Sequence, residues 1–188
     1  MTELLRVSKD ICYYGGKGKG KSMVLAYEGF DKLLKGYTIY SNMHMNYKHI
    51  YIDSLKKIEM CQNGYLILDD LEQWLSSRKW TKNPEELLTM ILMAGKRKIT
   101  ILYSVKRPEN IDLLLRDTTD YWGEVDLIPN FKTNDIHEFY EKSKHLENLM
   151  IKIKWINDKG EEIHTQYIGN LKFCGSLYNT YEEIIKIR

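Results

Sequence analysis

A glycine-rich segment near the start of the chain combines groups that bind phosphate and metal. The segment reads Gly15-x-x-x-x-Gly20-Lys21-Ser22; the β-prone run Ile11 to Tyr14 precedes it, and helical spacing of apolar residues follows. Glycines let a backbone wrap closely and aim N–H groups at an anion, and a helix start adds partial positive charge. A lysine and a hydroxyl at the end of such a loop suit the β- and γ-phosphates and Mg²⁺. The spacing therefore predicts a nucleoside-triphosphate site.

The strand, loop and helix form the context of a P-loop, which gives each residue of the loop an expected role. We expect Lys21 to bridge the β- and γ-phosphates of ATP and to act in catalysis, and the hydroxyl of Ser22 to ligate Mg²⁺. Lys17 and Lys19 make the loop unusually basic, although either could be a solvated side chain. The residues predicted to contact the nucleotide are Gly15, Gly16, Lys17, Gly18, Lys19, Gly20, Lys21, Ser22 and Met23.

Two adjacent aspartates follow a second apolar run. Tyr65 to Leu68 is continuously apolar and is closed by Asp69-Asp70, which is typical of a central parallel strand with a Walker B aspartate at its tip. We expect Asp69 to hold Mg²⁺ directly or through water. Asp70 occupies the place where many ATPases carry a glutamate that polarises the attacking water, and Glu72 is the substitute candidate. Alternatively, Asp70 and Glu72 cap the helix that follows.

Strands and helices alternate over the first two thirds of the chain. Strands are predicted at residues 11–14, 37–42, 65–68 and 99–105, and helices at 21–34, 84–94 and 111–116. This alternation predicts an α/β fold of three α/β/α layers, the P-loop NTPase arrangement, with a mainly parallel central sheet. Beyond about Trp122 the pattern changes, and residues 150–156 and 163–168 predict a C-terminal β-hairpin added to the sheet edge. One domain is expected over residues 1–188, with the hairpin addition at about 150–170.

Composition narrows the class of protein. Hydrophobic residues make up 43% and charged residues 29% of the 188 residues, which is typical of a soluble globular domain. An uninterrupted apolar stretch of bilayer length is missing from the sequence, so we expect a cytoplasmic protein. The cysteines and histidines are scattered without ligand spacing, which argues against a transition-metal site. The formal net charge of +2 permits nucleic acid as a partner but does not indicate it.

Several later segments carry a resemblance to a known group of ATPases. They are Asp69 to Arg78, Ala94 to Lys98, Lys106 to Asp112, Arg116, and the closing Leu177 to Glu183. Together these segments look like the FtsK/HerA superfamily of translocating ATPases, whose fold is RecA/FtsK-like. Within it they are most similar to the genome-packaging ATPases of archaeal viruses and to the zonula-occludens-toxin-like phage assembly ATPases.

The resemblance implies roles for several basic residues. Arg97 matches an arginine finger that reaches the ATP of a neighbouring subunit, although Lys96-Arg97-Lys98 could equally be a basic surface patch. Lys106 matches a polar sensor of the γ-phosphate that is usually glutamine, and this departure puts the sensor in doubt. Arg78 and Arg116 match arginines of the viral and phage members. Each could contact phosphate, contact another subunit or form a salt bridge within the fold.

The resemblance also implies an activity and partners. It implies ATP hydrolysis with Mg²⁺ by a ring of identical subunits, expected to be a hexamer, that moves double-stranded DNA into a viral capsid. Capsid or membrane vertex proteins are further implied partners, and the host cytoplasm or the virion is the implied location. The phage proteins carry a membrane helix after the ATPase domain and this sequence ends without one, which favours a packaging motor. The alternatives are a virion assembly or extrusion ATPase, a low-turnover nucleotide switch and a small-molecule P-loop kinase.

Overall fold

The computed structural model describes residues 9–76, 84–157 and 159–179, and these residues form one twisted sheet covered by helices. The strands lie in the order β3 (Ile50–Tyr51), β2 (Thr38–Ser41), β4 (Gly64–Leu68), β5 (Ile99–Val105), β1 (Ile11–Tyr14), β6 (Tyr121–Pro129), β7 (Leu149–Ile156) and β8 (Glu162–Ile168). The pairs from β3 to β6 are parallel, whereas β6 with β7 and β7 with β8 are antiparallel. The predicted mainly parallel sheet is therefore confirmed.

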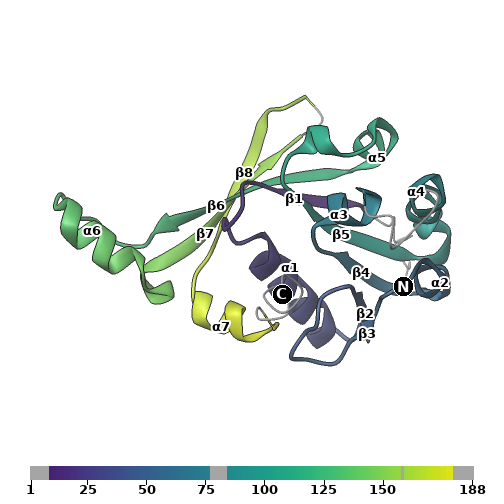
Figure 1. Cartoon of the computed structure of the whole chain (residues 1–188), viewed down its shortest axis with the longest axis horizontal. Coiled ribbons are helices and arrows are strands. Elements are labelled where there is room, and N and C mark those ends of the chain that lie inside the picture. The colour runs from purple at the N-terminus through teal and green to yellow at the C-terminus, as the bar shows by residue number, and fades with distance from the viewer. Residues whose placement is uncertain (1–8, 77–83, 158, 180–188) are drawn as a thin grey trace, which may run out of the picture.

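Helices cover both faces of this sheet (Figure 1). The α-helices are α1 (Lys21–Leu34), α2 (Leu55–Met60), α3 (Leu71–Ser76), α4 (Pro84–Leu92), α5 (Leu113–Thr118), α6 (Ile136–Ser143) and α7 (Leu171–Ser176). Short 3₁₀ helices are η1 (Ala94–Arg97), η2 (Pro108–Asn110) and η3 (Leu146–Asn148). Helices α1 and α7 lie on one face, and α2 to α5 contribute to the core on the other.

The central strand β1 shows how the two faces are filled. Successive side chains of a strand point to opposite faces, and Cys12 and Tyr13 are both almost completely buried, each in a different core. Cys12 packs in the core that contains Leu71 of α3, whereas Tyr13 packs in the core that contains Val24 of α1. The predicted three layers are thus present, because a strand buried on both faces needs helices on each side.

The hairpin predicted at the C-terminal end joins the sheet through a strand that the sequence pattern did not reveal. β6 pairs in parallel with β1 on one side and antiparallel with β7 on the other, with Val125 opposite Ile153. It carries Gly123, Glu124 and Pro129, so its composition is unlike that of a buried central strand. β7 and β8 then form the predicted hairpin.

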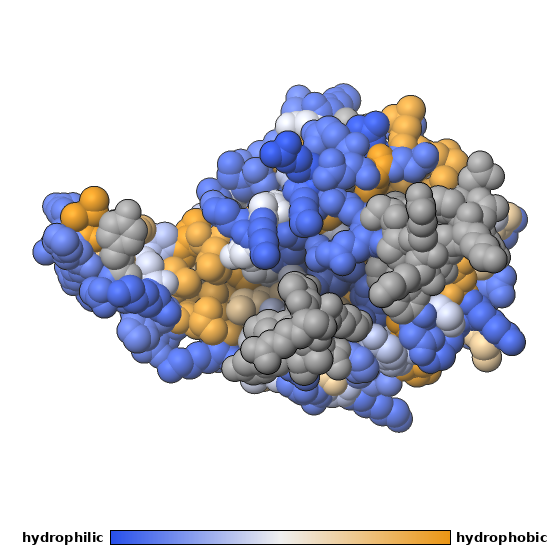
Figure 2. Space-filling view, in the orientation of Figure 1, coloured by the Kyte–Doolittle hydropathy of each residue, from blue (hydrophilic) through white to orange (hydrophobic). Residues whose placement is uncertain are grey.

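Strands β6 and β7 extend beyond the core and carry α6 away from the body of the molecule (Figure 1). The pairing continues to the end of both strands, where Pro129 lies opposite Leu149. Phe131 and Phe139 pack against each other at 5.8 Å between ring centroids and hold α6 to the strand end. Figure 2 shows an apolar area on this arm between α6 and the body.

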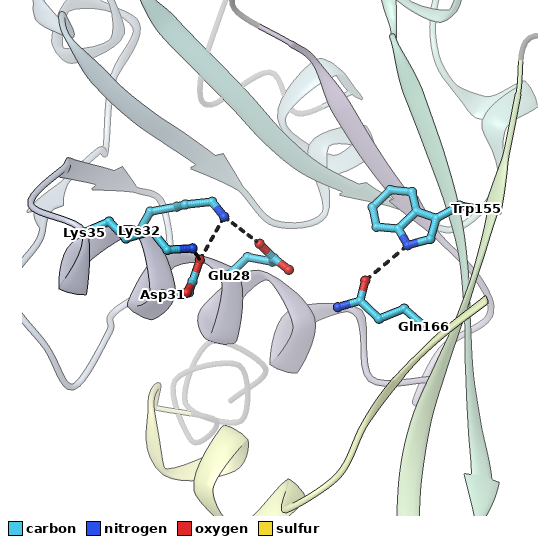
Figure 3. A network of polar contacts seen from close by, with 6 residues as sticks. All are labelled: Glu28, Asp31, Lys32, Lys35, Trp155 and Gln166. Carbon is cyan, nitrogen blue, oxygen red and sulfur yellow. Dashed lines mark hydrogen bonds and ion pairs between the residues drawn. The ribbon is translucent and has the colours of Figure 1, made fainter. Parts of the chain in front are cut away.

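Partly exposed ion pairs lie along α1, the helix that follows the glycine-rich loop (Figure 3). Lys32 Nζ lies 3.4 Å from Glu28 Oε2 and 2.9 Å from Asp31 Oδ2, and Lys35 Nζ lies 2.6 Å from Asp31 Oδ2. These hydrogen bonds lower the pKa of Asp31, chiefly through Lys35. Figure 3 also shows Trp155 of β7 donating to Gln166 of β8 at 3.1 Å, which ties the hairpin together.

A partly buried carboxyl group, that of Asp10 just before β1, makes the stability of the fold depend on pH. Burial, and then the negative charge of Asp120, raise the pKa of Asp10 to about 7. Between pH 4 and 7 the folded state therefore binds more protons than the unfolded state, and stability falls as pH rises through this window. We expect Asp10→Asn to raise the free energy of unfolding by about 1 to 2 kcal/mol at pH 8 and to leave it unchanged at pH 4.

Urea unfolding of the wild type and Asp10→Asn at the two pH values measures this difference. Asp53→Asn is the control, because the hydrogen bond from Lys57 lowers the pKa of Asp53 and its removal cannot stabilise the fold at pH 8. An equal gain for Asp10→Asn at both pH values would contradict the assignment.

Candidate functional site

The loop between β1 and α1 has the backbone of a phosphate cradle. Gly15, Gly18 and Gly20 have φ angles of 152°, 76° and 94°, which residues with a side chain rarely adopt. A Cβ atom at Gly15 would lie 2.5 Å from the carbonyl oxygen of Val125 in β6, so glycine is required there. α1 begins at Lys21, directly after Gly20, and its first N–H groups lie at the end of the loop.

The two functional side chains at the start of α1 are held in place by their neighbours. Lys21 is 7% exposed, and its Nζ donates to the carbonyls of Gly15 at 2.8 Å and Gly16 at 3.1 Å. Ser22 Oγ donates to Asp69 Oδ2 at 2.7 Å. The structure thus brings the glycine-rich loop, the lysine, the hydroxyl and the aspartate together, although Ser22 and Asp69 are 47 residues apart.

Two residues that the sequence did not single out form hydrogen bonds with Asp69. Ser104 of β5, which is completely buried, donates its hydroxyl to Asp69 Oδ1 at 2.5 Å. Asn42, directly after β2, accepts from Asp69 N at 2.8 Å and donates to Asp69 O at 2.9 Å. A polar residue within an apolar strand was a signal for Ser104, and Asn42 is the last residue of the strand predicted at 37–42.

Asp70 has a left-handed backbone with a φ of 48°, an uncommon conformation for a residue other than glycine. Its N–H donates to Ser104 Oγ at 2.9 Å, which supports this turn. Partial burial, followed by the charge of Asp69, raises the pKa of Asp70, while Lys21 and Lys106 act in the opposite direction. Asp70 is therefore a partly buried carboxylate close to the charged groups of the loop.

Glu72 is engaged with the loop that follows β5. Its Oε1 accepts from the main-chain N–H groups of Lys106 at 2.5 Å and Arg107 at 3.2 Å, and its Oε2 accepts from Asn110 Nδ2 at 3.2 Å. These contacts join the start of α3 to the loop containing Lys106, whose own side chain is exposed. Glu72 thus accepts three hydrogen bonds from this loop, whereas Asp70 Oδ2 accepts one from Gln73 Nε2 at 3.0 Å.

The remaining basic residues of the loop differ in their surroundings. Lys19 Nζ lies 2.6 Å from Asp126 Oδ1 of β6, with both side chains about half exposed. Lys17 is exposed. The ion pair of Lys19 fastens the loop to β6, and the position of Lys17 is compatible with a solvated side chain or with a phosphate contact.

The oxygen donors in this site fit Mg²⁺ and similar hard divalent cations. Among the residues that the structure describes, histidine, cysteine, aspartate and glutamate form no group of three that could hold a metal ion by themselves. Ser22 and Asp69 offer a hydroxyl and a carboxylate, the hard oxygen ligands that Mg²⁺ prefers. Since Mg²⁺ keeps several waters and binds phosphates in such sites, two protein ligands are sufficient.

Arg97 does not lie with these residues. It precedes β5, at the amino end of a parallel strand, whereas the glycine-rich loop and Asp69 follow the carboxyl ends of β1 and β4. Its guanidinium donates to the carbonyls of Ile58 at 2.6 Å, Glu59 at 2.7 Å and Met90 at 2.9 Å. These contacts cap the ends of α2 and α4, and the arginine-finger role stays a prediction.

The contacts of Arg97 predict a structural effect of its removal. We expect Arg97→Ala to lower the free energy of unfolding by about 2 to 3 kcal/mol, because three carbonyls lose a charged donor. Turnover per folded molecule falls as well only if Arg97 is the predicted finger. Urea unfolding and turnover below the transition measure both quantities. The exposed neighbour Lys96→Ala is the control. An unchanged stability with lost turnover, restored by mixing with Lys21→Ala subunits, would instead establish the finger.

Arg78 and Arg116 are the other two arginines that the resemblance singled out, and the described residues show no phosphate-facing position for either. Arg78 lies outside the residues that the structure describes. Arg116 lies in α5, which leads to the amino end of β6. The glycine-rich loop lies at the other end of the parallel strands, because it follows the carboxyl end of β1.

Within the described parts of the chain, no helix is both long and apolar enough to cross a membrane.

A glycine-rich loop between β1 and α1, with an aspartate after β4 that meets the serine of the loop, defines the P-loop NTPase fold. This is the fold class expected from the sequence, with its α/β layers and its added hairpin.

Solved structures of the same fold agree with this assignment. The N-terminal domain of zonular occludens toxin from Neisseria meningitidis matches with a TM-score of 0.55 and 15% identity, over 92% of this chain and 100% of that chain. The flagellar accessory protein FlaH from Methanocaldococcus jannaschii matches with a TM-score of 0.54 and 14% identity, over 86% and 84%.

A viral protein is also among the solved structures of similar fold. The genome packaging NTPase B204 from Sulfolobus turreted icosahedral virus 2, in complex with AMP, has a TM-score of 0.50 and 12% identity, over 85% of this chain and 98% of that chain. No protein-family model matches the chain, and no curated protein matches its sequence. The predicted resemblance to toxin-like and genome-packaging ATPases is confirmed at the level of the fold.

Proposed function

We propose that this protein is an ATP-hydrolysing motor of the FtsK/HerA type that assembles as a ring of identical subunits and moves double-stranded DNA. The observation that carries the hydrolytic part is the 2.7 Å contact between Ser22 Oγ and Asp69 Oδ2 beside the buried Lys21. A hydroxyl that gives its proton to a carboxylate keeps its lone pairs for a cation. Ser22 and Asp69 would therefore hold Mg²⁺, which supplies positive charge to the β- and γ-phosphates when bound.

The remaining residues act on the nucleotide and on water. The N–H groups of the glycine-rich loop and the start of α1 face the phosphates, and Lys21 offsets the charge that develops on the γ-phosphate. Asp70 orients the attacking water and accepts its proton, because its carboxylate is partly buried and lies close enough to Lys21 to interact with its charge. The bond that breaks is the β–γ phosphoanhydride, and the products are ADP and inorganic phosphate.

The DNA-moving part of the proposal is supported by similarity. A neighbour in fold is a genome packaging NTPase, and the segments around Asp69, Arg97 and Lys106 resemble translocating ATPases. A motor of this kind holds the duplex by its phosphates, which are recognised by lysine and arginine without base readout. The same similarity supports a homo-oligomeric ring.

Steady-state turnover with and without duplex DNA tests the proposal, together with the mass in solution in the presence of ATP. Stimulation by DNA of any sequence, lost at high salt, and a multi-subunit mass are the expected results. Turnover that DNA does not change, or a monomer under all conditions, would refute the motor and leave the nucleotide site standing.

A low-turnover nucleotide switch is the second candidate, and one observation favours it. Glu72 accepts hydrogen bonds from three donors of the loop after β5, and the shorter Asp70, which accepts one from Gln73, is then the water-orienting carboxylate. A carboxylate that lies further from the attacking water takes its proton less efficiently. Tight ATP binding with slow turnover that no DNA accelerates would select this function.

A further inference from the structure

Asp69 lies beyond the last residue of β4 that pairs with β2. The parallel ladder between β2 and β4 pairs Ser41 with Ile67, and Asn42 N donates to Ile67 O at 3.2 Å. Asp69 is two residues further along, and the chain then turns at Asp70 with a φ of 48°. A residue at such a point needs other contacts to fix the direction of its side chain.

The side chain of Asn42 provides these contacts on the side of β2. Its Oδ1 accepts from Asp69 N at 2.8 Å and its Nδ2 donates to Asp69 O at 2.9 Å. A side-chain amide carries the donor and the acceptor of a peptide group, so it pairs with the main chain as a neighbouring strand would. Asn42 thus continues the β2–β4 pairing as far as Asp69.

The carboxylate of Asp69 is held independently of its main chain. Oδ1 accepts from Ser104 of β5 and Oδ2 accepts from Ser22 of α1. With the main chain held by Asn42, the backbone and the carboxylate are fixed from β2, β5 and α1 together. Partners that orient a ligand of a metal commonly change its metal affinity by about 10- to 100-fold when they are removed.

We propose that Asn42 is a positioning residue, which sets the carboxylate of Asp69 for the Mg²⁺ of the bound nucleotide without touching the nucleotide itself. This inference rests on the proposed nucleotide site. Its specific content is that Asn42 acts through the two hydrogen bonds to the main chain of Asp69, so that its removal weakens the metal and spares the phosphate contacts of the loop.

Binding of Mn²⁺, a paramagnetic substitute for Mg²⁺, to the ADP-loaded protein tests the inference by electron paramagnetic resonance. For Asn42→Ala we expect the Mn²⁺ affinity to fall by about 10-fold. We expect the ADP affinity measured in EDTA to stay within about twofold of the wild type, because Gly15 to Ser22 are unchanged. The Mg²⁺ concentration that gives half-maximal turnover should rise in the same proportion.

The chain offers a matched control in the same loop. Asn46 also donates its side-chain amide to a main-chain carbonyl, that of Ser176 at 2.8 Å, and Asn46→Ala should change neither affinity. Asn42→Asp serves if the alanine variant does not fold: it keeps the acceptor for Asp69 N, loses the donor to Asp69 O, and should also bind Mn²⁺ more weakly.

The outcomes separate the inference from the proposed function. A wild type that binds no nucleotide overturns the nucleotide site itself. A wild type that binds Mn²⁺ with ADP, together with Asn42 variants of unchanged Mn²⁺ affinity, overturns the positioning role alone. A loss of ADP affinity in EDTA equal to the loss of Mn²⁺ affinity also overturns it, because the effect would then be a general disturbance of the site.

Discussion

Lys21→Ala is expected to abolish hydrolysis and to lower nucleotide affinity by about 100-fold. The variant removes a buried ammonium from the start of α1, where it lies within hydrogen-bond distance of the Gly15 and Gly16 carbonyls. Hydrogen bonds to charged groups contribute about 1.5 to 3 kcal/mol each. Replacing a lysine that bridges two phosphates removes more than one such bond. A fluorescent ATP analogue measures the affinity, and phosphate release measures the turnover.

Lys35→Ala is the control for this variant. Lys35 directly follows the same helix at its other end and forms an exposed ion pair with Asp31, which contributes little to stability. Its replacement should leave affinity and turnover unchanged, and thermal unfolding of both variants excludes a folding defect. Normal turnover by Lys21→Ala would remove the P-loop assignment.

Asp70→Asn is expected to lower turnover by about 10²- to 10⁴-fold, which is the usual contribution of a general base, while nucleotide binding is retained. The reason is that asparagine keeps the size of the side chain and the N–H contact to Ser104, but cannot accept a proton. The measurements are phosphate release and binding of the ATP analogue to the same preparation.

Glu72→Gln is the variant with which Asp70→Asn is compared. Glutamine still offers its Oε1 atom to the N–H groups of Lys106 and Arg107, so the loop after β5 is preserved. We expect its turnover to fall much less than that of Asp70→Asn. A larger fall for Glu72→Gln would transfer the water-activating role to Glu72, as the sequence alone allowed.

The parts of the site that the sequence predicted well are those that lie within one segment. The loop from Gly15 to Ser22 is fixed by glycine positions and by the strand and helix on either side, and the structure has β1 and α1 where the pattern placed them. Asp69 was predicted from the apolar run before it, and the structure places it against Ser22. Local chemistry and the rule that parallel strands share one carboxyl edge were sufficient.

The features that the sequence did not reveal are contacts between residues that are far apart in the chain. Asn42 and Ser104 lie 27 and 35 residues from Asp69, and neither belongs to a motif. β6 was missed because glycine, acidic residues and proline hide its strand character. Arg97 lies within a segment that resembles the superfamily, and the sequence could not show that its guanidinium meets carbonyls of α2 and α4; its finger role stays a prediction.

By itself the sequence determined the glycine-rich loop, the order of most strands and helices, and the aspartate after the apolar strand, because these depend on residues adjacent in the chain. The tertiary structure decided which distant groups meet: Glu72 with the loop after β5, Arg97 with carbonyls of α2 and α4, and Asn42 and Ser104 with Asp69. Such assignments depend on the order of strands in the sheet, and that order results from packing across segments that sequence spacing does not encode.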